Sequence, residues 1–188
     1  MSTLGAVLAG GGSSRMGLDK AEVVIGGETM LHRVTSTLRE VLPRVVVLGP
    51  ERSGFECWPD VVAARGPLAG IATALSRMEE DCVLVVAVDQ PFVRPMTLER
   101  LAGLEAVIPV VPVDGEGARQ VTCALYPRTV GEAAMEEGAS DGSIQSLLDR
   151  VSFQAVTPEI WGSWGEDGRS WYSVDTPEAL EEGTRRFL

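Results

Sequence analysis

Two unbroken apolar runs constrain the fold of this chain more than any other feature of its sequence. Residues 45–48 read VVVL and residues 82–88 read CVLVVAV, with no polar side chain in either run. A strand with one solvated face alternates apolar and polar residues, so such runs suit central parallel strands that are covered on both faces. At 29–42, Met30, Val34 and Leu38 recur at helical spacing. Strands that alternate with amphipathic helices predict an α/β fold with a mostly parallel sheet.

The same alternation continues along the rest of the chain. We expect further strands at 4–9, 105–111, 121–126 and 153–156, and helices at 67–78, 97–104, 129–137, 143–150 and 177–187, the last with Thr176 as its N-cap. The loops at 114–119 and 162–169 are expected to be the most flexible. The 188 residues contain no internal repeat and are a suitable length for one core. We therefore expect a single domain over residues 1–188, a three-layer αβα structure with a Rossmann-like sheet.

The composition argues against several classes of partner. A net charge of −11, from 16 basic and 27 acidic side chains, repels the phosphates of nucleic acid. Cys57, Cys82 and Cys123 are widely spaced without a CxxC pattern, which favours buried thiols in a reducing compartment over disulfides or a zinc site. No apolar run approaches the roughly 20 residues that span a bilayer, and no basic segment precedes the first apolar run. We expect a cytoplasmic protein without a nucleic-acid or membrane partner.

The stretch LAGGGSSRMGLDK at 8–20 is a candidate phosphate-binding loop. Its glycines let backbone N–H groups approach phosphate oxygens without obstruction by Cβ atoms. It is neither a P-loop, because Gly17 is followed by Leu-Asp, nor a dinucleotide fingerprint, because Arg15 stands where the third glycine belongs. Arg15 suits the β- and γ-phosphates as a fork of donors, and Lys20 suits the α-phosphate or an acceptor phosphate. A plain glycine turn with two solvated cations is the alternative.

Three further segments carry groups suited to phosphate chemistry. Asp89 directly follows the run at 82–88, and a carboxylate at the carboxyl end of a central strand is a candidate Mg²⁺ ligand, although it also suits an Asp-x-Pro turn. GPLAGI at 66–71 places glycines around a proline that opens a helix, which fits either a close approach of a base or ribose or a simple helix start. SVDTPEAL at 173–180 places Asp175 in a turn before Thr-Pro and a helix, an arrangement that helix capping alone explains.

In this order and at this spacing, the motifs resemble those of the MobA-like NTP transferases, the family that includes molybdenum cofactor guanylyltransferase. The resemblance runs from residue 4 to about residue 180. Two departures stand out. The metal-bearing turn reads Asp-Gln-Pro, where the family more usually has Asp-Thr-Pro or Asp-Met-Pro. The segment 152–171, with Trp161, Trp164 and Trp171, matches little of the family, so the role of the Trp-rich part at 161–171 is left open.

The resemblance implies a fold of the nucleotide-diphospho-sugar transferase type and a Mg²⁺-dependent transfer of GMP from GTP to the phosphate of molybdopterin. Arg15 and Lys20 are then the catalytic residues, and Asp89 and Asp175 the metal ligands. The implied nucleotide-binding residues are Leu8, Ala9, Gly10, Gly11, Gly12, Lys20, Asp60, Gly66, Pro67, Leu68 and Asp89.

The resemblance leaves the substrates less certain than the reaction type. Gly11 stands where the cytidylyltransferase relatives have Ala, which favours GTP. The resemblance also implies transient contact with other proteins of molybdenum cofactor synthesis. One alternative is a related nucleotidyltransferase that uses CTP or another phosphorylated acceptor. The other is a non-catalytic module that binds nucleotide or pterin. A Ser-His-Asp mechanism is not available, because His32 is the only histidine and falls within a predicted helix.

Overall fold

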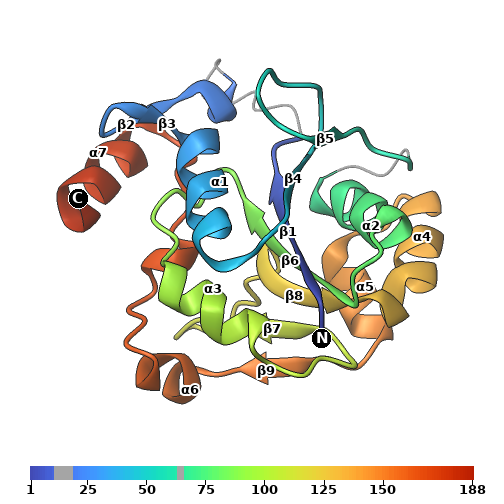
Figure 1. The fold of residues 1–188 in the computed structure, drawn as a ribbon. Coiled ribbons are helices and arrows are strands. Elements are labelled where there is room, and N and C mark those ends of the chain that lie inside the picture. Colours follow the sequence, from blue (N-terminus) through green and yellow to red (C-terminus); the bar gives the residue numbers. More distant parts are fainter. Residues whose placement is uncertain (11–18, 63–65) are drawn as a thin grey trace.

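The computed structural model describes residues 1–10, 19–62 and 66–188. A seven-stranded sheet forms its centre, in the order β5-β4-β1-β6-β8-β7-β9 (Figure 1). These strands are β1 (Thr3–Leu8), β4 (Val45–Leu48), β5 (Cys57–Trp58), β6 (Cys82–Ala87), β7 (Val110–Pro112), β8 (Cys123–Pro127) and β9 (Gln154–Val156). The apolar runs β4 and β6 flank β1 in parallel, with Val7 opposite both Val47 and Val86. Only β8 runs antiparallel to its neighbours β6 and β7, so the predicted mostly parallel sheet is confirmed.

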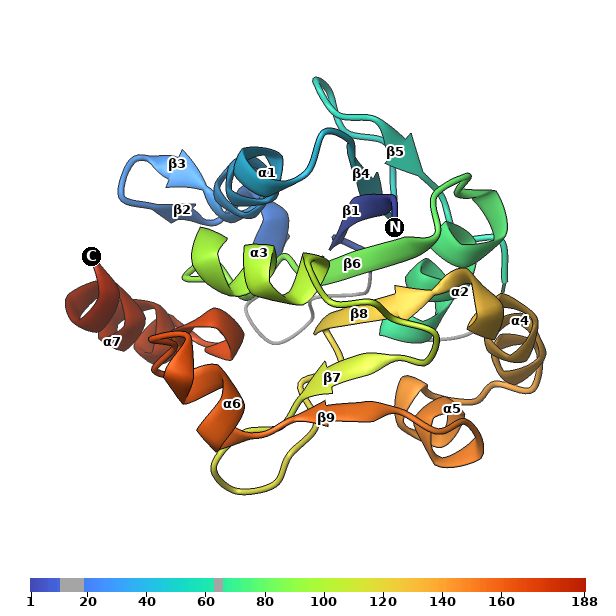
Figure 2. The ribbon, with the colours of Figure 1, turned by 60° about the horizontal axis from the view of Figure 1, so that its bottom comes forward.

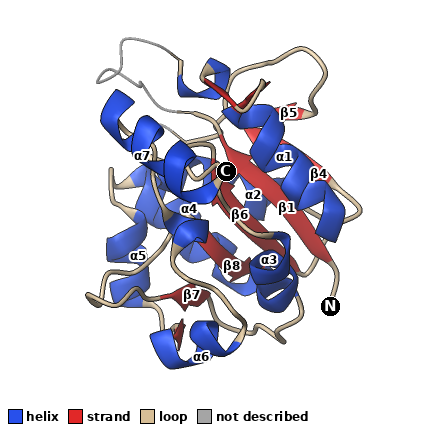
Figure 3. Cartoon of the chain, turned by 90° about the vertical axis from the view of Figure 1, so that its left-hand side faces the viewer, coloured by secondary structure: helices blue, strands red, loops and turns tan. Residues whose placement is uncertain are grey.

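Helices cover both faces of this sheet (Figure 2). The helices α1 (Met30–Val41) and α3 (Pro95–Ala102) pack on one face, and α2 (Pro67–Arg77), α4 (Gly131–Ala139) and α5 (Ile144–Arg150) on the other. Consecutive residues of β1 enter opposite cores: Ala6 packs with α2 and Val7 with α1. The strands are apolar throughout because both faces are buried, which produces the predicted αβα layers (Figure 3).

Threonine side chains cap two helices, and the cap at Thr176 was predicted from the sequence. Thr29 Oγ1 accepts a hydrogen bond from His32 N (3.2 Å) at the start of α1. Thr176 Oγ1 accepts one from Ala179 N (3.2 Å) at the start of α7 (Pro177–Phe187). His32 is exposed on α1, as a helical surface residue. None of the helices in the described ranges combines the length and apolar character that a bilayer crossing requires.

Several short elements differ from the sequence-based prediction. The hairpin of β2 (Val24–Ile25) and β3 (Glu28–Thr29) was not foreseen; its turn depends on Gly26 and Gly27, both at positive φ. The expected strand at 105–111 is shorter, because pairing begins only at β7, and Val107 before it is 72% exposed. Helix α6 (Pro158–Ser163) was also missed. Of the cysteines, Cys82 and Cys123 are buried free thiols as expected, whereas Cys57 is only partly buried.

The two loops expected to be flexible are held by hydrogen bonds. In the loop at 114–119, Asp114 Oδ1 accepts from the backbone N–H groups of Glu116 and Ala118, both at 2.9 Å. In the loop at 162–169, the carboxylate of Glu166 is buried and binds several backbone N–H groups. The sequence of these segments does not reveal that an acidic side chain turns toward backbone N–H groups.

Candidate active site

A cavity of about 520 Å³ lies at the edge of the sheet where β1 and β6 end. Leu8, Ala9 and Gly10 reach it from β1, and Ala87 to Gln90 reach it from β6. Lys20, Gly66 and Pro67 complete this side of the lining. The opposite side is formed by Gln120, Thr122, Trp171 and Ser173. The carboxyl edge of a parallel sheet is the place where open α/β folds bind ligands.

Lys20 brings two distant carboxylates together in this site. It begins a 3-10 helix, Lys20–Glu22, that is capped by Asp19, whose Oδ1 accepts from Ala21 N (3.1 Å). Lys20 Nζ donates to Asp89 Oδ2 at 2.9 Å and also to Asp175 Oδ1. Burial lowers the pKa of Lys20, but the hydrogen bonds to Asp175 and Asp89 outweigh it and the pKa is raised. The ammonium group is therefore charged at neutral pH.

Backbone hydrogen bonds fix the two carboxylates relative to each other. Val174 N donates to the carbonyl oxygen of Asp89 (2.7 Å), which joins the segment that carries Asp175 to the turn after β6. Gln90, buried in that turn, accepts from Ala87 N through its Oε1 (3.2 Å). The glutamine that departs from the usual family turn thus has a structural task here: its side chain completes the turn that presents Asp89.

The site suits a divalent cation held by two carboxylates. The oxygens of Asp89 and Asp175 contact one and the same ammonium nitrogen, so both are within reach of a single cation. Within the described ranges no group of three or more His, Cys, Asp or Glu side chains could hold a metal ion. One or two carboxylates, completed by substrate phosphates and water, is the ligand set that Mg²⁺ commonly takes in phosphate-transfer sites.

The remaining predicted site residues lie at different distances from the cavity. Leu8, Ala9, Gly10, Gly66 and Pro67 line it. Gly66 has φ 75°, which favours glycine, and Pro67 opens α2 directly after it.

The side chain of Leu68 is fully buried in the core beneath α2, so only its backbone is available to a ligand. Its selection as a contact residue rested on the motif, which does not show which way each side chain of the helix points.

Asp60 lies beside the cavity without lining it. Its Oδ2 would be 3.7 Å from a Cβ atom placed on Gly10. Partial burial raises the pKa of the Asp60 carboxyl, although the residue as a whole is exposed. Gly11, Gly12 and Arg15 lie outside the described residues, so their predicted roles stay predictions.

The side of the cavity formed by Gln120, Thr122, Trp171 and Ser173 was not predicted from the sequence. Gln120 and Thr122 precede β8, whose antiparallel direction brings its first residues to the edge where β6 ends; Ala87 N donates to Thr122 O (2.8 Å). The available signal was two polar side chains at the start of the predicted strand at 121–126, Gln120 just before it and Thr122 within it. It was not usable, because the direction of that strand could not be read from the sequence.

Known proteins resemble this chain in sequence and in fold. Residues 5–156 match the family model described as the MobA-like NTP transferase domain. A probable molybdenum cofactor guanylyltransferase of Natronomonas pharaonis is 33% identical over 97% of both chains. One of Pelotomaculum thermopropionicum is 37% identical over 118 residues, 58% of each chain. The crystal structure of molybdopterin-guanine dinucleotide biosynthesis protein A from Archaeoglobus fulgidus, 23% identical, superimposes with a TM-score of 0.83 over 97% of both chains. The predicted fold type is confirmed.

Proposed function

The chain belongs to the MobA-like NTP transferase family, and on this premise we propose that it transfers GMP from GTP to the phosphate of molybdopterin and releases pyrophosphate. Relatives that cover nearly the full length of the chain are named molybdenum cofactor guanylyltransferases. The observation that carries the proposal is the convergence of Lys20, Asp89 and Asp175 in a cavity at the carboxyl edge of the sheet. A binding module without catalysis has no need for such a cluster of opposite charges.

The reaction makes few demands on proton transfer. An oxygen of the acceptor phosphate forms a bond to the α-phosphorus of GTP, while the bond from that phosphorus to the β-phosphate oxygen breaks. The nucleophile is already an anion, so positioning and charge neutralisation supply most of the catalysis. Lys20 would neutralise charge at the α-phosphate, and Arg15, which lies outside the described residues, at the leaving pyrophosphate.

The chain's carboxylates would hold the divalent metal that such transfers use, and we propose Mg²⁺. Asp89 and Asp175 supply hard oxygen ligands on a framework tied by the bond from Val174 N to Asp89 O. Bound Mg²⁺ supplies further neutralisation of phosphate oxygens. The nucleotide would lie along Ala9, Gly10, Gly66 and Pro67, where the backbone is open to a close approach, with Asp60 at its margin.

The wider setting of the protein is also part of this proposal. We propose one domain over residues 1–188, since the sheet takes strands from Thr3 to Val156 and Val174 returns to the end of β6. We also propose a cytoplasmic location, transient contact with other proteins of molybdenum cofactor synthesis, and no nucleic-acid partner, because the net charge is −11.

The direct test is pyrophosphate release from GTP and molybdopterin in the presence of Mg²⁺. We expect turnover by the wild-type protein and a loss of at least about 100-fold in Asp89→Asn, since charge stabilisation in such sites is worth that much. Asp149→Asn, which removes an exposed carboxylate of α5, is the matched control. Absence of pyrophosphate with every NTP, or an Asp89→Asn variant as active as the control, would refute the enzyme function.

The choice of base has its own test. The melting temperature is compared with GTP, CTP, ATP and UTP, each with Mg²⁺. Ligands that bind only the folded state raise it, so GTP alone should produce a clear shift. A shift with CTP instead would refute GTP as the donor, and a shift with GTP that is indifferent to Mg²⁺ would favour a nucleotide-binding module.

A further inference from the structure

Among the residues that the structure describes, one wall of the cavity carries no charged side chain. The charged lining residues Asp19, Lys20 and Asp89 lie near the ends of β1 and β6, whereas the wall beside β8 is formed by Gln120, Thr122, Trp171 and Ser173. An indole surrounded by amide and hydroxyl groups suits a planar, uncharged ring system with hydrogen-bonding edges. The cavity therefore has two chemically different halves, a charged half with Lys20 and Asp89 and an uncharged half beside β8.

Trp171 is held rigidly in this wall. It is 9% exposed and packs edge-on against Trp161, with ring centroids 5.3 Å apart at an interplanar angle of 72°. Trp161 in turn donates from its indole Nε1 to Val113 O (2.9 Å). An aromatic wall whose position is fixed before binding loses little conformational freedom when a ligand stacks on it.

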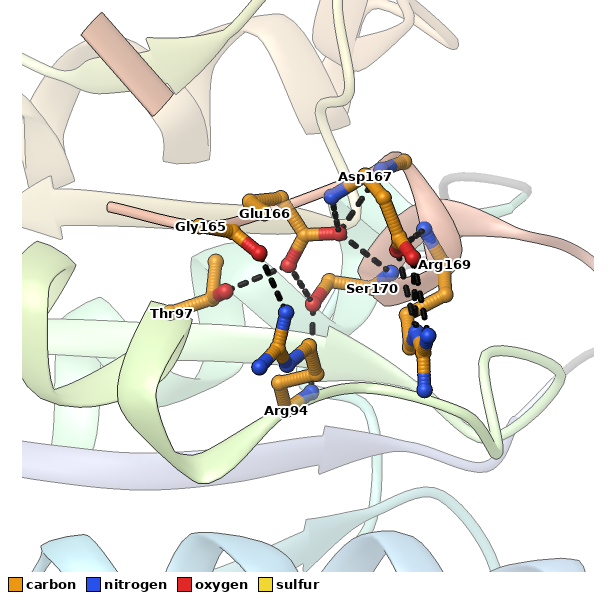
Figure 4. A network of polar contacts seen from close by, with 8 residues as sticks. Arg94, Thr97, Gly165, Glu166, Asp167, Arg169 and Ser170 are labelled. Atoms are coloured by element: carbon orange, nitrogen blue, oxygen red, sulfur yellow. Dashed lines mark hydrogen bonds and ion pairs between the residues drawn. The ribbon is translucent and has the colours of Figure 1, made fainter. Parts of the chain in front are cut away.

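A buried carboxylate shapes the turn that leads to Trp171 (Figure 4). Glu166 is 4% exposed, and its Oε1 accepts from the backbone N–H groups of Asp167 (3.0 Å), Gly168 (2.8 Å) and Ser170 (3.3 Å). Its Oε2 accepts from the hydroxyl groups of Thr97 and Ser170. Thr97 belongs to α3, so the carboxylate both folds the turn on itself and fastens it to a helix of the core.

The same turn is tied to α3 at a second point. The Ser170 hydroxyl accepts from Arg94 N (3.1 Å), and the Arg94 guanidinium donates to Gly165 O. Trp171 follows Ser170 directly in the chain, and Asp175 follows four residues later. Glu166 thus fixes the start of a short segment that begins with Trp171 of the uncharged wall and ends at Asp175, which binds Lys20.

We propose that Glu166 is a positioning residue for the acceptor: its hydrogen bonds place Trp171 so that the uncharged wall binds the planar ring system of the acceptor. The inference rests on the proposed function, which places the nucleotide on the side of Gly10 and Gly66. The acceptor phosphate must reach the α-phosphate beside Lys20, so its ring system extends over the other half of the cavity. Glu166 itself is not among the residues that line the cavity, so it acts through Trp171.

The test compares KM values for the two substrates. Glu166→Gln keeps the size of the side chain but places an NH₂ group opposite hydrogen-bond donors. Glu137→Gln is the matched control, because it makes the same change in another buried carboxylate, which binds Ser146 and Arg150 on the opposite face of the sheet. Loss of a charge-assisted hydrogen bond corresponds to roughly a tenfold change in affinity. We expect Glu166→Gln to raise the KM for molybdopterin at least about tenfold and to leave the KM for GTP within about twofold, while Glu137→Gln changes neither.

A second pair of variants covers the case in which Glu166→Gln does not fold. Thr97→Val removes one donor to the carboxylate and keeps the side-chain shape, and Thr97→Ser restores the hydroxyl group. The KM for molybdopterin should rise with Thr97→Val and return toward the wild-type value with Thr97→Ser. Equal changes in both KM values, a change in kcat alone, or no difference from Glu137→Gln would overturn the proposal.

Binding separates this inference from the proposed reaction. Quenching of tryptophan fluorescence by molybdopterin is measured for wild type, Trp171→Phe and the matched variant Trp164→Phe, whose indole lines a different cavity. Quenching that depends on Trp171 and Glu166 supports the inference even if no NTP is turned over, in which case only the proposed reaction fails. Turnover with unaltered molybdopterin binding in Trp171→Phe and Glu166→Gln overturns the inference and leaves the reaction intact. Absence of molybdopterin binding by the wild type refutes both.

Discussion

A single methyl group added at Gly49 should disturb the backbone of Gly10, which lines the cavity. Gly49 follows β4, has φ 139°, and lies against the end of β1. A Cβ atom at this position would be 2.7 Å from Gly10 N and 3.0 Å from both Ala9 C and Gly10 Cα. All three are backbone atoms, so no side-chain rotation relieves the overlap. Gly49→Ala must therefore displace the backbone at Gly10, which lines the nucleotide half of the cavity.

A second glycine, Gly54, allows the free-energy cost of backbone strain to be separated from that of overpacking. Gly54 also has positive φ (86°), but a Cβ atom there meets no atom within 4 Å. Gly54→Ala should cost only the backbone strain, about 1–2 kcal/mol. Gly49→Ala adds overpacking worth about 1–3 kcal/mol, for a total of about 2–5 kcal/mol.

The two variants are compared by urea unfolding and by the KM for GTP. We expect Gly49→Ala to be less stable than Gly54→Ala and to raise the KM for GTP, with little change in KM for Gly54→Ala. Equal free energies of unfolding in the two variants would refute the close approach at Gly10. A large loss of stability with an unchanged KM for GTP would refute the link between that approach and the site.

Three further predictions follow from buried or paired groups. The Cys123 thiol is fully buried, and burial raises its pKa to about 12. It should therefore resist a thiol reagent in the native protein, whereas the partly buried Cys57 should react. Rapid labelling of Cys123 would contradict its burial. Tyr126→Phe should lower the free energy of unfolding by about 0.5–1.5 kcal/mol, because Val121 O loses the hydrogen bond from the Tyr126 hydroxyl (2.7 Å). An unchanged free energy of unfolding in urea would mean that this hydrogen bond contributes nothing to stability. Lys20 has a pKa raised above its ordinary 10.5 in the folded protein, so its contribution to stability is complete below pH 10.5 and is lost as the pH rises through the raised pKa. The difference in stability between wild type and Lys20→Met should therefore stay constant from neutral pH to about pH 10.5 and shrink above it, and a difference that grows with pH there would refute the pairing.

The fold could be predicted from the sequence because its signals are local. The apolar runs at β4 and β6 lack polar residues, and only strands covered on both faces tolerate that pattern. Thr176 marks the start of its helix by the chemistry of its hydroxyl group. Elements that depend on pairing with a distant segment, such as the two-residue strand β5, leave no such signal.

The candidate site divides in the same way. Its chemical groups can be read from the chain: a glycine-rich loop, a lysine after it, and carboxylates in turns at Asp89 and Asp175. The contact of one ammonium group with both carboxylates depends on folding, because the bond from Val174 N to Asp89 O joins positions 85 residues apart in the chain. The inward turn of Glu166 and the place of Trp171 in the cavity likewise depend on folding, since whether a carboxylate is solvated or buried among donors is a property of packing and not of local sequence.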